Sequence, residues 1–178
     1  MDILAFLDLV ESSAVVGPVW HGSPHSFDEF RPGPARKLEM LSFGFHFFSD
    51  RAVAERYAFG DLRRKKTSGV LYEAKLSYTK QLDIERVVKK GEVLWSMVEE
   101  LAPRMRHFTL DGVKACWLRN VLDGVPPART EVVLRQWGFD LVKYKAIIRF
   151  LSGSSPNEAA AYIALNSSQI NVVAKHLE

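Results

Sequence analysis

The sequence predicts an α+β fold, in which β-sheets are flanked by helices. Residues 70–78 alternate between inward and outward side chains, which is the clearest strand pattern in the chain. The clearest helical spacing lies in the middle of the chain, at Val93, Leu94, Met97, Val98 and Leu101. The expected strands are not spaced as regular strand–helix–strand units, which argues against a doubly wound parallel sheet.

Length and composition indicate one domain over residues 1–178, with 47% hydrophobic and 25% charged residues. Residues 1–16 contain acidic but no basic side chains, so we expect an N-terminal amphipathic helix rather than a signal peptide. No apolar run approaches the roughly 20 residues that span a bilayer, so no membrane partner is expected. Cys116 is the single cysteine, which excludes an internal disulfide and fits a cytoplasmic setting.

The remaining elements follow from local signals. An apolar run at 15–20 predicts a strand that delivers His21 to a cleft. Asp50 is expected to cap a short helix that extends to Tyr57. Pro103 should end the helix that begins near residue 93. Further strands are expected at 139–144, 162–165 and 170–173, the last two separate or forming one bent strand.

Two more helices are expected between the central helix and the C-terminal strands. Asp111 could cap a helix that ends at Gly124, and Thr130 a second one that ends at Gly138. Cys116 would lie on the first of them, where a buried structural role is favoured over that of a nucleophile.

The tetrapeptide at residues 20–23, Trp-His-Gly-Ser, carries the strongest functional signal. The imidazole of His21 offers an aimed hydrogen-bonding group, and Gly22 leaves its backbone open to a flat ligand. A second cluster of small and aromatic residues at 44–57 repeats this pattern. Together the two segments predict a nucleotide pocket.

Several other site classes find no support. The chain has no P-loop, no GxGxxG and no HExxH motif, and its five histidines are scattered, so no metal is expected. The net charge is +3, with basic runs at 63–66 and at Arg31, Arg36 and Lys37. These runs are either solvated loops or surfaces for phosphate-rich or acidic partners.

Four motifs occur in a characteristic order: WHGSPHSFDEF at 20–30, GFHFFSD at 44–50, AVAERYA at 52–58 and YIALNSSQINVV at 162–173. This order resembles the ADP-ribosyltransferase superfamily, in the branch shared by diphtheria-type toxins, poly(ADP-ribose) polymerases and small phage or bacterial toxins. The resemblance extends from Val19 to Val173. It implies split mixed or antiparallel sheets flanked by helices, with NAD as co-substrate and no metal.

The resemblance also implies roles for individual residues. His21 would bind the adenosine ribose, Gly22 would pair its backbone with the nicotinamide carboxamide, and Ser23 would assist beside it. Tyr57 would stack on the nicotinamide, although its spacing from the Asp50 cap is about one residue shorter than expected. Phe47 would form another wall. Phe45 and Phe48 are expected to be core residues.

The catalytic carboxylate departs from the family pattern. The resemblance places a glutamate just before the Tyr-Ile strand, where this chain has Ala161. Glu158 could supply the carboxylate from a differently turned loop. Alternatively, alanine has replaced a glutamate at 161, or the protein works without a carboxylate or is inactive.

The expected function is therefore mono-ADP-ribosylation of a macromolecule, with nucleic acid slightly favoured over protein as the acceptor. Small size fits a bacterial or phage toxin or defence effector, which could have an antitoxin or immunity partner. The alternatives are an NAD glycohydrolase, a catalytically dead module that binds ADP-ribose, NAD or nucleic acid, and a plain nucleic-acid-binding domain.

Overall fold

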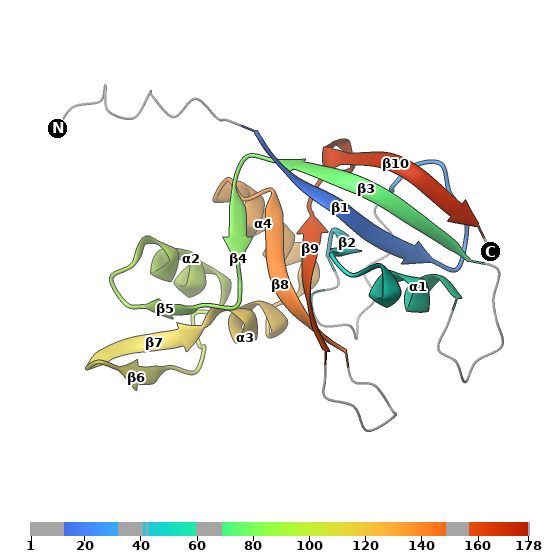
Figure 1. The fold of residues 1–178 in the computed structure, drawn as a ribbon. Coiled ribbons are helices and arrows are strands. Elements are labelled where there is room, and N and C mark those ends of the chain that lie inside the picture. The colour runs from blue at the N-terminus through green and yellow to red at the C-terminus, as the bar shows by residue number, and fades with distance from the viewer. Residues whose placement is uncertain (1–12, 32–40, 42, 60–68, 149–156, 178) are drawn as a thin grey trace.

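Strands from both ends of the chain build one large sheet, seen in a computed structural model that describes residues 13–31, 41, 43–59, 69–148 and 157–177 (Figure 1). Its seven strands run in the order β10 (Ile170–Leu177), β3 (Val70–Tyr78), β1 (Ala14–Ser23), β2 (Phe45–Phe48), β9 (Asn157–Ala164), β8 (Leu141–Ile148) and β4 (Gln81–Asp83). Neighbours are antiparallel except β4 and β8, which are parallel.

The large sheet is split into two halves. The pairing between β1 and β2 that joins them consists of one residue pair, Trp20 with Phe48. On one side of this junction β10, β3 and β1 run diagonally, and on the other β2, β9 and β8 run at an angle to them (Figure 1). The predicted α+β class with split mixed sheets is therefore confirmed.

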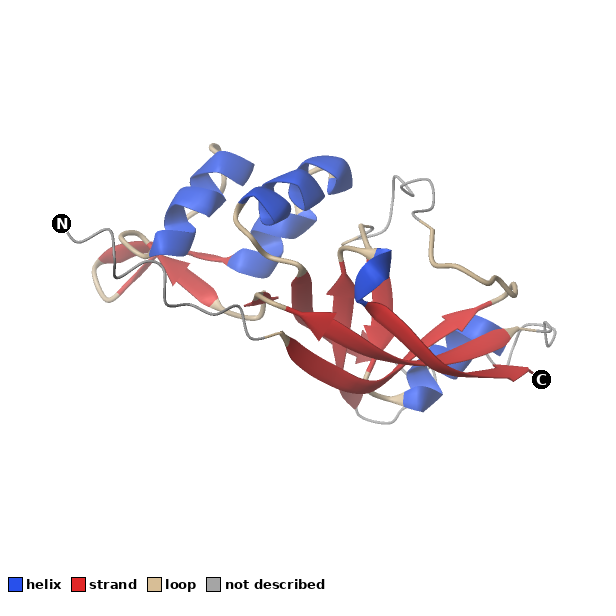
Figure 2. Ribbon diagram, turned by 90° about the horizontal axis from the view of Figure 1, so that it is seen from above, coloured by secondary structure: helices blue, strands red, loops and turns tan. Residues whose placement is uncertain are grey.

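A smaller unit lies at one end of the molecule (Figures 1 and 2). It contains a three-stranded antiparallel sheet in the order β5 (Val87–Lys89), β7 (Val113–Trp117) and β6 (Phe108–Leu110). Helices α2 (Val93–Leu101), α3 (Leu118–Asp123) and α4 (Pro127–Gln136) gather there, whereas α1 (Arg51–Phe59) covers β1 at the other end. None of the helices in the described part of the chain has the length and apolarity to cross a membrane.

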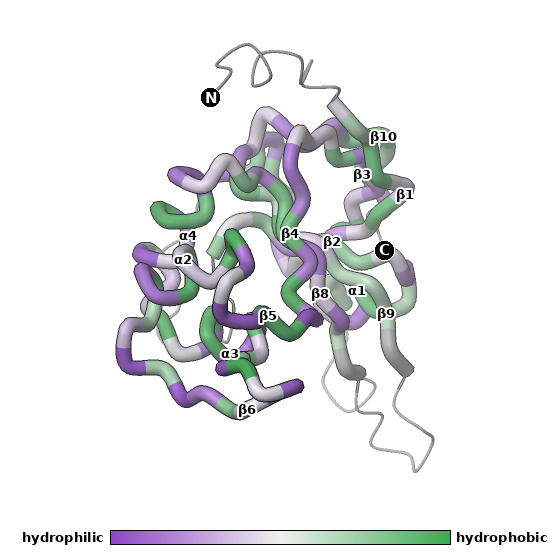
Figure 3. The backbone as a smooth tube through the Cα atoms, turned by 90° about the vertical axis from the view of Figure 1, so that its left-hand side faces the viewer, coloured by the Kyte–Doolittle hydropathy of each residue, from purple (hydrophilic) through white to green (hydrophobic). Residues whose placement is uncertain are grey.

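Two apolar clusters occupy the two faces of the large sheet. The helical face carries Phe48, Leu71, Ala161 and Ile163, which pack with residues of all four helices. The second face carries a smaller cluster of Val19, Phe45, Phe47, Ala74, Leu76, Leu141 and Ala164. Hydrophobic and hydrophilic residues are interspersed along the chain, and several hydrophilic residues occur around β6 (Figure 3). Burial of Phe45 and Phe48 confirms their predicted core role.

Local sequence signals predicted several elements correctly. Strand β3 and helix α2 have the expected bounds, and α2 ends just before Pro103. The Ala52 amide donates a hydrogen bond of 2.8 Å to Asp50 Oδ1, so Asp50 caps α1 as predicted. The C-terminal apolar runs form two strands, β9 and β10, separated by a 3₁₀ turn (Ser167–Gln169).

The predicted helix from Asp111 to Gly124 is wrong in its first half. Val113–Trp117 is strand β7, and the helix is only α3. Asp111 and Gly112 have φ angles of +52° and +75° and connect β6 to β7 as a tight hairpin turn. An Asp-Gly pair favours such a turn, and this preference prevails over a helix cap.

Two further boundaries are corrected. Helix α4 begins at Pro127, so Thr130 lies inside it and donates its hydroxyl hydrogen bond to the Pro126 carbonyl at 3.3 Å. Proline at the first helical position explains the earlier start. The N-terminal helix predicted for 1–16 lies mostly outside the described residues, and residues 14–16 belong to β1 because they pair with β3.

Candidate functional site

Four elements from three separate regions of the sequence meet where the two halves of the sheet join. The ring centroids of His21 in β1 and Phe47 in β2 are 5.5 Å apart. The ring of Phe48 lies 5.1 Å from that of Tyr57 in α1, and the Phe48 backbone pairs with Ala161 in β9. The junction of the split sheet is therefore the candidate site.

The sheet divides these residues into two groups. His21 and Phe47 lie on the second face, whereas Phe48, Tyr57 and Ala161 lie on the helical face. Alternation of side chains along each strand produces this division. A ligand that contacts both groups must therefore extend across the junction.

The imidazole of His21 has a defined tautomer. Its Nδ1 lies 2.8 Å from the carbonyl oxygen of His46, which can only accept, so Nδ1 donates and Nε2 is an acceptor. Burial lowers the pKa of His21, and the hydrogen bond to His46 opposes this only in part. The ring is therefore neutral at pH 7, with aromatic neighbours at centroid distances of 5.1–6.1 Å, namely Phe27, Phe30, Phe47 and Tyr72.

Gly22 and Ser23 have structural partners of their own. A Cβ atom on Gly22 would lie 1.8 Å from the carbonyl oxygen of Ala54, so a side chain there is incompatible with the packing of α1 on β1. The Ser23 hydroxyl donates to the His25 carbonyl at 2.7 Å and accepts from the His25 amide at 3.2 Å. Both residues thus have a role in the fold that requires no ligand.

Tyr57 stacks on Phe48 with an interplanar angle of 14°. Tyr57 is 62% exposed, and Phe48 is buried beneath it. A flat ring inserted between them needs a spacing of about 7 Å, two van der Waals layers of about 3.5 Å. A nicotinamide would therefore separate the two rings or stack on the exposed face of Tyr57.

A buried alanine occupies the position at which the resemblance implies a carboxylate. Ala161 is fully buried, and its backbone pairs with Phe48 on one side and Tyr144 on the other. Glu158 lies in strand β9 and not in a loop as expected, because its backbone pairs with Ile147 of β8; its side chain lies outside the described part. Three residues of strand place it about 10 Å from Ala161.

Two polar pairs that the sequence did not predict lie beyond Ala161. The Tyr144 hydroxyl lies 3.0 Å from Nδ1 of His46. Burial raises the pKa of Tyr144 above its ordinary value, and the nearby Tyr57 adds to the shift. Further along, Arg119 donates to Glu85 at 2.5 Å beside a cavity of about 250 Å³. No local motif links these residues, because His46 and Tyr144 come from β2 and β8, and Arg119 and Glu85 from α3 and the segment after β4.

Other predicted features lie away from the junction. Cys116 is buried in β7, as expected for a structural cysteine, and burial with the nearby Glu92 raises the pKa of its thiol. The basic run at 63–66, with Arg36 and Lys37, lies outside the described residues. Arg31 is exposed and pairs with Glu29 at 2.9 Å. The described ranges contain no cluster of three potential metal ligands.

Matched against known protein families and against curated proteins, the chain has no match.

Proposed function

We propose that this chain is an NAD-dependent enzyme that transfers ADP-ribose to a macromolecule. The observation that carries the proposal is the convergence of His21, Phe47, Tyr57 and residue 161 at one junction. His21, Phe47 and Tyr57 belong to three motifs of the resemblance, and residue 161 directly precedes the fourth, 140 positions (161 minus 21) after His21. His21 and Phe47 lie on one face of this junction and Tyr57 and residue 161 on the other, so a ligand that extends across the junction could reach all four.

Each residue has a chemical role compatible with its geometry. The neutral His21 can accept a ribose hydroxyl hydrogen at Nε2, because Nδ1 is bound to His46. The exposed ring of Tyr57 offers a stacking surface for nicotinamide. In the transfer, the bond between nicotinamide and ribose C1′ breaks with its electron pair leaving on nicotinamide. The acceptor atom then bonds to C1′ and loses its proton.

Residue 161 determines how fast this step can be. A carboxylate there would lie beside Phe48, on the face that carries Tyr57, and could bind the ribose 2′-hydroxyl. Such a group offsets the positive charge that develops on the ribose, and losing an electrostatic partner of this kind costs about 10²–10³ in rate. With alanine at 161, we therefore expect NAD binding with slow turnover.

The test compares the chain with Ala161→Glu and Ala161→Gln, using NAD labelled in its adenosine part and a cell lysate as the source of acceptor. We expect Ala161→Glu to raise labelling and nicotinamide release by about 10²-fold or more. Ala161→Gln, which is similar in size but uncharged, should not. Ala160→Glu adds the same carboxylate at the neighbouring strand position and serves as the matched control.

Calorimetry and circular dichroism complete the test, because a charge at a fully buried position can unfold the chain. Folded variants that neither bind NAD nor release nicotinamide would contradict the proposal. Free ADP-ribose without labelled macromolecule would identify an NAD glycohydrolase. NAD binding without turnover in folded Ala161→Glu would identify a binding module, which the buried alanine at 161 favours as the second candidate.

A further inference from the structure

A second cavity lies in the smaller unit, away from the sheet junction. Its volume is about 740 Å³, and it is lined by the end of α2, the segment before β6, the end of β7, α3 and the start of α4. Leu101, Cys116 and Val121 contribute apolar surface to it. We call it the arginine cavity, because Arg104, Arg106 and Arg129 line it. Its size is within the range of pockets that bind small organic groups.

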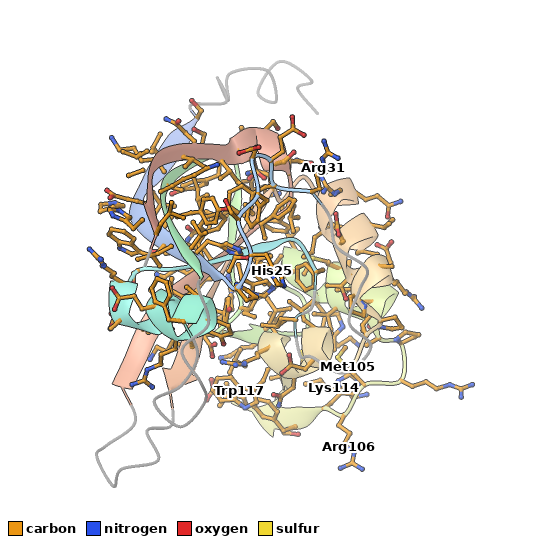
Figure 4. The ribbon with its side chains drawn as sticks, turned by 90° about the vertical axis from the view of Figure 1, so that its right-hand side faces the viewer. His25, Arg31, Met105, Arg106, Lys114 and Trp117 are labelled. Carbon is orange, nitrogen blue, oxygen red and sulfur yellow. The ribbon has the colours of Figure 1, made fainter. Side chains whose placement is uncertain are left out.

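The charged side chains among the described residues that line the arginine cavity are all basic. None of the described residues that line it is Asp or Glu, and His107 lines it as well. Arg104 and Arg106 have no ion pair within the described ranges, and Arg106 extends outward at the lower edge in Figure 4. Arg129 donates to the backbone carbonyl of Glu100 at 2.5 Å, so its charge is not neutralised by a carboxylate. Unpaired arginines of this kind attract anions.

Nearby carboxylates are already bound elsewhere. They have partners as follows: Glu99 accepts from Trp95 Nε1 at 2.7 Å, Glu100 from Trp137 Nε1 at 2.9 Å, and Asp111 pairs with Lys89 at 2.6 Å. Each of these carboxylates therefore has a partner other than the three arginines. The cavity therefore remains complementary to an anionic ligand.

Two exposed aromatic rings lie at the same cavity. Phe108 in β6 is 36% exposed and Trp117 in β7 is 50% exposed. Both line the cavity, and their ring centroids are 6.3 Å apart. Exposed aromatic rings beside unpaired arginines provide what a nucleic acid strand needs, because bases stack on the rings while guanidinium groups bind phosphates.

We propose that the arginine cavity binds single-stranded nucleic acid, with phosphates at Arg104 and Arg106 and a base on Trp117. The rings favour a nucleic acid over an acidic peptide, which would use the arginines but not a stacking surface. An unpaired strand is required because a base in a duplex is not free to stack on a side chain. This inference rests on the proposed function at one point only: the bound strand would be the acceptor of ADP-ribose.

The test uses the full chain without NAD and fluorescein-labelled oligo(U) RNA and oligo(dT) DNA, with binding followed by fluorescence anisotropy. We expect the double variant Arg104→Ala and Arg106→Ala to weaken binding about tenfold. It should also lower, by about two, the number of ions released on binding, as measured from the salt dependence of the affinity between about 50 and about 200 mM. Trp117→Ala should weaken binding at least about fivefold. Arg31→Ala is the control, since Arg31 is exposed, does not line the arginine cavity and lies at the opposite edge of the view from Arg106 (Figure 4).

Equal affinity of the chain and its variants for both oligonucleotides would overturn this proposal. Binding of poly-glutamate instead of the oligonucleotides would also overturn it and would identify an acidic protein partner. A preference for duplex over single-stranded nucleic acid would overturn it as well. Comparing the affinities for oligo(U) RNA and oligo(dT) DNA shows which kind of nucleic acid the cavity prefers. Because no NAD is present, failure of the transferase assay leaves this result unaffected, and the two proposals fail separately.

Discussion

Tyr57 and Phe48 form a parallel stack with ring centroids 5.1 Å apart, one ring 62% exposed and the other buried. The stack joins helix α1 to strand β2 at the junction of the split sheet. An exposed tyrosine held flat by a buried phenylalanine has little rotational freedom. This arrangement prepares a surface on which a planar ligand can bind without first ordering the side chain.

Replacing Tyr57 tests whether this surface binds the nicotinamide. Tyr57→Ala should weaken NAD binding about fivefold or more, because it removes a stacking contact of about 1–3 kcal/mol. Tyr57→Phe keeps the ring and should retain near-normal affinity. Calorimetry with NAD measures both. Equal affinities for the chain and Tyr57→Ala would exclude Tyr57 from the binding site.

Gly22 should tolerate no side chain. Gly22→Ala places a Cβ atom 1.8 Å from the Ala54 carbonyl oxygen, a backbone atom that cannot move without shifting α1. We expect a loss in free energy of unfolding at or above the upper end of the ~1–3 kcal/mol typical of overpacking. Urea denaturation measures it. Gly124→Ala is the matched control, since its Cβ would meet its nearest atom at an ordinary 3.4 Å, and a comparable loss there would contradict the explanation.

His21 should make the stability of the fold depend on pH. Burial holds its pKa in the folded chain below the ordinary 6.5. Below about pH 6.5 the unfolded chain therefore binds more protons, and the free energy of unfolding falls as the pH drops toward the folded pKa. His21→Asn keeps an N–H donor for the His46 carbonyl but does not titrate, so it should reduce this dependence.

Urea denaturation at about pH 7.5 and about pH 5 measures the effect. His25→Asn, the same substitution at an exposed position, is the control. An identical pH dependence in His21→Asn and the unaltered chain would show that other groups cause it.

Tyr72 should anchor the segment that covers His21. Its hydroxyl accepts from the Phe27 amide at 2.7 Å and donates to the Phe27 carbonyl at 2.9 Å, and its ring stacks on Phe27 at 4.5 Å. Tyr72→Phe keeps the ring but removes both hydrogen bonds, which should cost about 1–3 kcal/mol. Hydrogen exchange at the Phe27 amide should accelerate in this variant, whereas Tyr78→Phe should leave it unchanged. An unaltered exchange rate would contradict the anchoring role.

Elements with a strong local pattern agree with the sequence-based prediction. Strand β3 and helix α2 were predicted with their bounds, because periodic burial of one face is encoded within the segment itself. The helix predicted at Asp111 was wrong because a cap and a hairpin turn use similar residues. Only the pairing of β6 with β7 selects the turn.

The candidate site was predictable only in part. Motif order indicated His21, Tyr57 and residue 161, and the structure brings them to one junction. The motifs contained no sign that the sheet separates His21 from Tyr57. Tyr144 and the arginine cavity were missed, since their members come from separate elements and follow no fixed spacing.

By itself, the sequence determined the class of fold, the clearest strand and helix, and which residues have the chemistry for a nucleotide site. Those properties depend on residue type and short-range periodicity. The tertiary structure decided which face each residue occupies, that Gly22 is required for the packing of α1, and that three arginines surround one cavity. Such relationships arise from pairing and packing between distant segments, so no local pattern contains them.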